Sequence, residues 1–319
     1  MKLIFFWCSL CIFCSNSYSQ TRVILDMDID SDVDDVAALA MVHQLASNRK
    51  LILSAVIVTS DDPYAPLCVE AINTYFGKST IPIGFKKSQA ALKNHSRYTR
   101  QISENFPHQL TSYMEAWEAV SLYRKILNSS ADGSVVIVTV GHLTSLQDLL
   151  QSDPDKYSTL SGKALVLRKV SRWICMGGIF PAGKEANFYR PDPQSTVYCL
   201  AQWTKPVIFC GWEIGNKIIS GGPDLKSELS SESPVYMAFE LYNQFAGRPS
   251  WDQVAILLLT EKWKDFFAIV SNGKCQVEPD GSNKWITGAK SNHSYIILKS
   301  VADKEKIAAV INNMTKKQK

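Results

Sequence analysis

The sequence has few of the residues and runs that mark several large classes of protein. Its 319 residues include eight cysteines, three of which fall within the first 14 positions. The other five form no Cys-x-x-Cys pair, so a zinc site built from cysteines is not expected. These five lie mostly in apolar runs, which favours buried thiols, while an oxidising compartment would also permit one disulfide; they are Cys68, Cys175, Cys199, Cys210 and Cys275.

Other absences exclude several kinds of partner and several classes of enzyme. The net charge is only +4, and the one basic run is the short tail Lys316-Lys317-Gln318-Lys319, so nucleic acid is not an expected partner. No apolar run in the chain is long enough to form a stable membrane span. Gly-x-Ser-x-Gly, His-Glu-x-x-His and the Walker glycine loop are all missing. The chemistry of serine hydrolases, zinc peptidases and nucleoside triphosphatases that these motifs carry is therefore not expected.

The N-terminus has the pattern of a secretory signal. Lys2 supplies a positive start, an apolar core follows, and Ser-Tyr-Ser offers small residues for cleavage near Ser19. The apolar core is well short of the roughly 20 residues that cross a bilayer. We therefore predict a signal peptide over residues 1–19 and a single domain over residues 20–319, in a protein that is secreted or periplasmic.

Short apolar runs of the β type alternate with helical patterns along the rest of the chain. This alternation predicts an α/β fold with a mostly parallel open sheet and helices on both faces. Strands are expected within residues 22–28, 51–60, 81–85, 134–141, 172–178, 206–215 and 266–271. Helices are expected over residues 33–45, 67–77, 112–127, 143–150, 192–203, 233–247 and 252–263. Ligands of such sheets bind at the carboxyl ends of the strands.

The densest charge of the sequence follows the first predicted strand. Six aspartates occupy ten positions between two apolar runs: Asp26, Asp28, Asp30, Asp32, Asp34 and Asp35. A helix cap explains one or two of them. A calcium loop of the EF-hand type would need glycine in place of Ser31 and glutamate in place of Ala37. A phosphotransferase with a strand-end Asp-x-Asp stays open. So many carboxylates together require water or a cation, and Asp30 is expected to face solvent.

The stretch "LDMDIDSDVDDVAAL" resembles the signature of the inosine–uridine-preferring nucleoside hydrolase family, with the longer turn of a secreted bacterial branch. Asp28 matches the second aspartate of the strand end, and Asp34-Asp35 match the following pair. Further segments occur in the family's order, which extends the resemblance from about Arg22 to Leu259; they are "VTVGHLTSL", "ICMGGIF", "EANFYRPDPQST" and "GRPSWDQVAIL".

The resemblance implies an enzyme that hydrolyses the N-glycosidic bond of ribonucleosides and depends on calcium. Calcium takes six to eight oxygen ligands. By the resemblance, Asp28, Asp35, Asp252 and the backbone carbonyl of Val140 would supply several of them. Asp28 would also act as the catalytic base that accepts a proton from the attacking water.

The resemblance also assigns residues to the substrate. Asp34, Glu185 and Asn187 would hold the ribose hydroxyls, and Trp251 could stack on the base. His142, in the turn after the strand at 134–141, is a candidate acid for the leaving base. The partner would be a small nucleoside or ribosyl compound, and a homo-oligomer is compatible with the family.

Two departures from the family pattern keep alternatives open. Trp251 stands where well-studied purine-active members have a histidine, and two family asparagines have no match near Asp61-Asp62 and within "IFPAGK". One alternative is a hydrolase of the same fold that acts on another ribosyl or glycosyl compound. The other is a calcium-dependent ribose-binding protein without catalytic activity.

Overall fold

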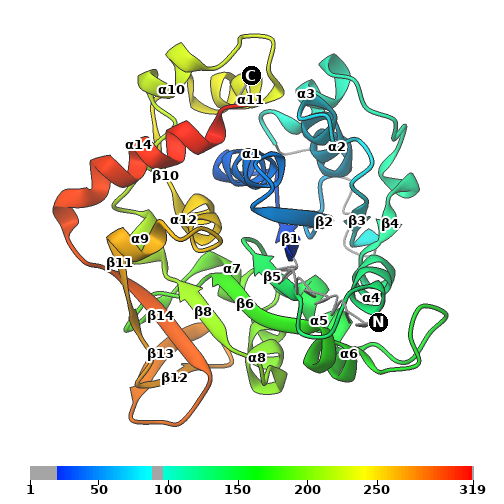
Figure 1. Ribbon diagram of the computed structural model, residues 1–319, viewed down its shortest axis with the longest axis vertical. Helices are drawn as coiled ribbons and strands as arrows, with labels where there is room; N and C mark the ends of the chain where they lie inside the picture. Colours follow the sequence, from blue (N-terminus) through cyan, green and yellow to red (C-terminus); the bar gives the residue numbers. More distant parts are fainter. Residues whose placement is uncertain (1–19, 88–95, 318–319) are drawn as a thin grey trace, which may run out of the picture.

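A nine-stranded sheet forms the centre of the computed structural model, which describes residues 20–87 and 96–317 (Figure 1). Every strand pair in it is parallel except β11 with β14, so the predicted mostly parallel sheet is confirmed. The predicted signal peptide lies outside the described residues. In spatial order the strands are β11 (Phe267–Val270), β14 (His293–Leu298), β8 (Val207–Cys210), β6 (Val170–Met176), β5 (Val135–Thr139), β1 (Thr21–Met27), β2 (Leu51–Val58), β3 (Ile83–Phe85) and β4 (Trp117–Glu118).

Successive side chains of a strand point to opposite sides of the sheet. Because both sides are apolar here, helices cover both faces. Val23 and Leu25 of β1 belong to one apolar cluster, and Ile24 between them belongs to the other. The first cluster includes α1 (Asp34–Ser47), α2 (Ala65–Tyr75), α11 (Pro234–Asn243), α12 (Trp251–Leu257) and α14 (Lys304–Thr315). The second includes α4 (Ala119–Ser129), α5 (Thr144–Gln151), α6 (Gly162–Lys169) and α8 (Pro193–Gln202).

Smaller elements complete the described chain. They are α3 (Thr99–Asn105), η2 (Tyr113–Glu115), β7 (Ala182–Lys184), α7 (Ala186–Tyr189), α9 (Trp212–Gly215), β9 (Ile219–Ser220), α10 (Pro223–Glu228), β10 (Arg248–Pro249), α13 (Trp263–Phe266), β12 (Gly273–Val277), β13 (Ser282–Thr287) and η3 (Val301–Asp303). None of the helices within the described residues is long and apolar enough to cross a bilayer.

The direction of strand order reverses at β1. The chain runs from β1 outward to β2, β3 and β4, and then returns to place β5 on the other side of β1. At such a reversal the connections leave in opposite directions, and a crevice opens at the carboxyl ends of the two central strands. The turn that begins at Asp28 follows β1, and Val140 follows β5, so both flank this crevice.

The structure differs from the sequence-based prediction in several regions, among them the helices α3, α6 and α10 and the strand β14, which were not predicted. The helix predicted over residues 112–127 begins only at Ala119, because the Glu118 carboxylate caps it by accepting from the Val120 backbone N–H at 2.8 Å. Residues 212–215 form α9 and do not continue the strand before them. The antiparallel sheet β12-β13-β7 and the helix α14 were not predicted.

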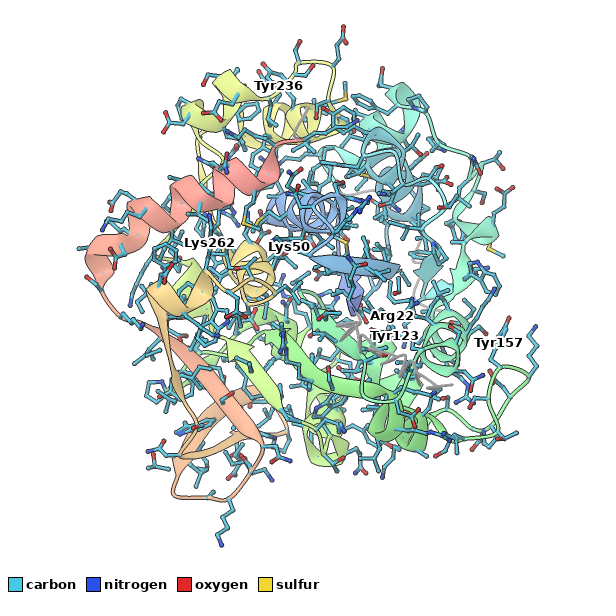
Figure 2. All side chains as sticks on the ribbon, viewed as in Figure 1. Arg22, Lys50, Tyr123, Tyr157, Tyr236 and Lys262 are labelled. Atoms are coloured by element: carbon cyan, nitrogen blue, oxygen red, sulfur yellow. The ribbon has the colours of Figure 1, made fainter. Side chains whose placement is uncertain are left out.

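Two hydrogen bonds fix the end of β1, one from α4 and one from the residue that follows β2. Tyr123 Oη donates to Asp26 Oδ2 at 2.6 Å, and Thr59 Oγ1 donates to Asp26 Oδ1 at 3.2 Å. Figure 2 labels Tyr123 of α4 and Arg22 of β1. Burial raises the pKa of Asp26 to about 7, against the opposing effect of these hydrogen bonds. Asp26 therefore supports the strand that delivers Asp28.

Candidate functional site

A cavity of about 310 Å³ at the carboxyl ends of β1 and β5 brings together all nine residues that the sequence put forward. They are Asp28, Asp34, Asp35, Val140, His142, Glu185, Asn187, Trp251 and Asp252. Asp32, one of the six clustered aspartates, also lines the cavity, as do six residues that the sequence did not single out as part of a site: Ser31, Met176, Ala186, Arg190, Trp212 and Arg248.

Three buried carboxylates form the floor of this cavity. Asp34 and Asp35 open α1, and Asp252 lies in the first turn of α12. The two helices pack against each other (Figure 1). One oxygen from each of the three carboxylates lies within 4.8 Å of the others. The Asp252 backbone N–H also donates to Asp34 Oδ2 at 3.3 Å. The fold thus joins carboxylates that are far apart in sequence.

The electrostatics of these carboxylates fit a divalent cation. Burial raises the pKa of Asp34, Asp35 and Asp252 well above the ordinary value, and the negative charge of neighbouring aspartates raises it further. Within the described chain, Asp35 Oδ1 is buried without a hydrogen-bond donor. Such an oxygen is costly unless something positive meets it. Clustered carboxylate oxygens are the ligands that hard divalent cations take.

Asp28 lies beside this cluster and pairs with a histidine. His142 Nε2 is 3.1 Å from Asp28 Oδ2, and both side chains are partly buried. Burial raises the pKa of Asp28, and the strongest opposing effect comes from His142. Both residues follow the ends of neighbouring parallel strands, β1 and β5. The structure therefore orients Asp28 into the cavity from the crevice that the strand order creates.

Glu185 and Asn187 also line the cavity. Glu185 caps α7, where its two oxygens accept from the Asn187 and Gly178 N–H groups at 2.9 and 3.0 Å. Burial raises the pKa of Glu185 to about 7. Asn187 Nδ2 donates to the carbonyl oxygens of Val140 at 3.1 Å and Met176 at 3.4 Å. The Asn187 amide nitrogen is thus engaged within the protein, which leaves Oδ1 as the atom able to accept from a ligand.

Trp251 forms an aromatic wall together with Trp212. Their ring centroids are 6.3 Å apart with an interplanar angle of 25°, and Trp251 Nε1 donates to the Trp212 carbonyl at 3.1 Å. Trp212 is 39% exposed, which is unusual for so large an apolar side chain. The sequence had placed Trp212 within a strand. Its position just after the end of β8 was the available signal, because ligands bind at strand ends.

The turn after β1 differs from expectation at Asp30. This residue was expected to face solvent, but it is only 7% exposed, and its Oδ2 accepts from Ser60 Oγ at 2.5 Å. The expectation was wrong because Ser60, after the end of β2, supplies a donor that the local sequence did not reveal. Asp30 lines a second cavity of about 420 Å³, which shares Ser31, His142 and Arg190 with the first.

Comparison with known proteins identifies the family. The profile of the inosine-uridine preferring nucleoside hydrolases matches residues 23–316. No curated protein sequence matches the chain.

Several solved structures share the fold. A plant nucleoside hydrolase superimposes with a TM-score of 0.69 at 17% identity, covering 92% of this chain and 98% of its own. An inosine-uridine preferring nucleoside hydrolase from Bacillus anthracis gives 0.66 at 15% identity, covering 92% and 100%. The type III effector protein XopQ, solved with adenosine diphosphate ribose, gives 0.69 at 13% identity, covering 93% of each chain. The chain belongs to the inosine-uridine preferring nucleoside hydrolase family and is a hydrolase acting on N-glycosyl bonds.

Proposed function

We propose that this enzyme hydrolyses ribonucleosides to free base and ribose and that it depends on calcium. The supporting observation is the convergence of Asp34, Asp35 and Asp252 beside Asp28 in one cavity. These four carboxylates come from a strand end and from the starts of two helices, and burial raises the pKa of each. Burying four carboxylates together costs free energy, and a bound cation would offset that cost.

In this proposal Asp28, Asp35, Asp252 and the Val140 carbonyl would hold the calcium ion. The Val140 oxygen already accepts one hydrogen bond from Asn187, and a carbonyl oxygen has a second lone pair for another partner. When bound, the cation supplies a Lewis acid that lowers the pKa of water and a template for hydroxyl groups. The cluster offers only oxygen ligands, which calcium prefers and the softer transition metals do not.

Side chains of the protein accept the proton, bind the ribose hydroxyls and stabilise the developing charge. Asp28 accepts the proton of the attacking water, and its pairing with His142 orients the carboxylate for that transfer. Asp34 and Glu185 accept hydrogens from the ribose hydroxyls. As the bond to the base breaks, positive charge develops on the ribose ring, and the acidic cavity stabilises it.

The leaving base lies against the opposite side of the ribose. Asn187 accepts from a sugar hydroxyl through Oδ1, Trp251 stacks on the base, and His142 is the candidate donor of a proton to it. Trp212 extends this aromatic surface because its ring stacks on that of Trp251. Stacking of this kind contributes about 0.5–1.5 kcal/mol beyond area burial.

A panel of nucleosides, assayed with and without a chelator, tests the proposal. We expect release of free base and ribose from at least one nucleoside, loss of turnover on chelation, and recovery when calcium is added back. Turnover that survives complete removal of calcium would contradict the metal dependence. Binding of ribose without turnover of any compound would favour the calcium-dependent binding protein instead.

One observation favours widening the panel to other ribosyl compounds. The second cavity adjoins the first through Ser31, His142 and Arg190, so the site offers room beyond a nucleoside. XopQ, which shares the fold, was solved with adenosine diphosphate ribose. Preferential cleavage of a larger ribosyl compound would identify this chain as a hydrolase of that substrate class rather than of nucleosides.

Gly141→Ala is expected to lower kcat/KM by roughly 10²-fold, the loss that a displacement of about 1 Å can cause at a reacting group. A Cβ at position 141 would lie 2.5 Å from the Asp28 backbone nitrogen and 2.8 Å from Asp28 Cγ. Asp28 must therefore move. The control is Gly222→Ala, because a Cβ there meets nothing within 4 Å. Equal kcat/KM values for the two variants would show that the placement of Asp28 is not critical.

A further inference from the structure

Arg248 connects the two parts of the chain that carry the carboxylate cluster. Its Nε lies 3.1 Å from Asp32 Oδ1 and 3.0 Å from Asp32 Oδ2, and its Nη2 lies 2.5 Å from Oδ2. Asp32 belongs to the turn between Asp28 and Asp34, while Arg248 stands in β10, three residues before the start of α12. The pair therefore links the turn after β1 to the segment that delivers Asp252.

Both partners of this pair are fixed by further contacts. The Asp32 carbonyl accepts a hydrogen bond from Tyr98 Oη, and Asp32 Oδ1 accepts from the Val33 N–H at 2.7 Å. The Arg248 guanidinium lies 5.0 Å from the ring centroid of Trp251 and 5.6 Å from that of Tyr242. An arginine with a bidentate carboxylate and aromatic neighbours has a defined geometry, which a lysine cannot reproduce.

The carboxylate cluster needs such a link because its members repel one another. Asp34 and Asp252 stand on different helices, and the hydrogen bond between them is long at 3.3 Å. Asp32 adds a further negative charge to the turn that leads to Asp34, and the Arg248 guanidinium pairs with that carboxylate through Nε and Nη2. An attraction between the same two segments opposes their separation.

We propose that Arg248 is a positioning residue, which holds the turn at residues 29–33 and the start of α12 at the spacing that the calcium site requires. This inference rests on the proposed function. It concerns the geometry of the guanidinium and not its charge, since a positive charge near the site would by itself weaken the binding of a cation. A substitution that keeps the charge and removes the geometry therefore separates the two: weaker calcium binding is expected if the geometry matters, and no change if only the charge does.

Arg248→Lys keeps the charge and removes the bidentate geometry. We expect it to weaken calcium binding about 10-fold, the lower end of the effect of residues that orient metal ligands. Calorimetric titration of the metal-free protein with calcium measures this without any assay of activity. The matched control is Arg168→Lys, because Arg168 forms an exposed pair with Asp132 at 2.9 Å; its calcium affinity should equal that of the wild type.

A double-mutant cycle shows whether Arg248 acts through Asp32. In an Asp32→Asn background, Arg248→Lys should change calcium affinity less than twofold, because the bidentate partner is already lost. Full additivity of the two changes would overturn the inference, as would an Arg248→Lys variant that binds calcium as tightly as the wild type.

Two further outcomes separate this inference from the proposed function. If Arg248→Lys loses turnover while its calcium affinity is unchanged, the positioning role is wrong and the calcium-dependent reaction stands. If the wild type binds no calcium, both fail. Melting of the metal-free variants checks folding: a lower melting temperature with unchanged affinity would assign Arg248 to stability alone and overturn the inference.

Discussion

Asp28→Asn is expected to lower kcat by roughly 10²–10⁴-fold, the range that positioned base catalysis supplies. Asparagine has nearly the same shape as aspartate but cannot accept the proton of the attacking water, and it removes one negative charge from the cavity. His142 would keep a side-chain oxygen as its neighbour, so the turn after β1 should stay in place. The measurement is steady-state turnover of the preferred nucleoside at saturating calcium.

Asp132→Asn is a suitable control for this variant. Asp132 is exposed and pairs with Arg168 and Lys169, away from the residues that line the cavity. It should turn over substrate like the wild type. If Asp28→Asn keeps more than a tenth of the wild-type kcat, Asp28 is not the base.

Asp252→Asn is expected to abolish the stabilisation of the protein by calcium and, with it, turnover. A ligand at 100 times its dissociation constant stabilises the folded state by about 2.7 kcal/mol if it does not bind the unfolded chain. The wild type should therefore melt at a higher temperature when calcium is added, and the variant should not. Differential scanning calorimetry with and without calcium measures both effects.

Without calcium, Asp252→Asn should not lower the melting temperature of the protein. Burial and the charges of Asp34 and Asp35 raise the pKa of Asp252, so at neutral pH its ionised form destabilises the fold. Asp252→Asn removes that charge and should melt at the same or a higher temperature than the metal-free wild type. A variant that melts far lower without calcium would show that Asp252 stabilises the helix packing directly. Its loss of activity would then say nothing about the metal.

The resemblance to the family named the residues of the cavity, and local patterns explain why several of them lie at one edge of the sheet. Asp28, Val140 and the residues after β6 all follow apolar runs of the β type, and parallel strands bring their carboxyl ends to one edge. The Asp34-Asp35 pair opens a helix whose apolar pattern is continuous. Each of these placements depends on a few neighbouring residues, and the strand order then brings them together.

The features that were missed depend on partners distant in sequence. Asp32 and Arg248 are 216 positions apart, and neither has a local pattern that identifies the other. Strand β7 pairs with β13 about a hundred positions later, after a run too short to be recognised as a strand. Asp30 was wrongly expected to face solvent because its partner Ser60, which follows the end of β2, is 30 positions away in the sequence. Pairings of this kind follow from the tertiary fold and leave no period in the sequence.

The account depends on one divalent ion that joins carboxylates from α1, α12 and the end of β1. A crystal structure of the protein grown with excess calcium and ribose tests this directly. The account predicts one ion in the cavity with oxygens of Asp28, Asp35 and Asp252 at about 2.3–2.6 Å, the ordinary range for calcium, and with the sugar hydroxyls beside it. A cavity that holds ribose but no ion under those conditions, with the three carboxylates apart, would contradict it.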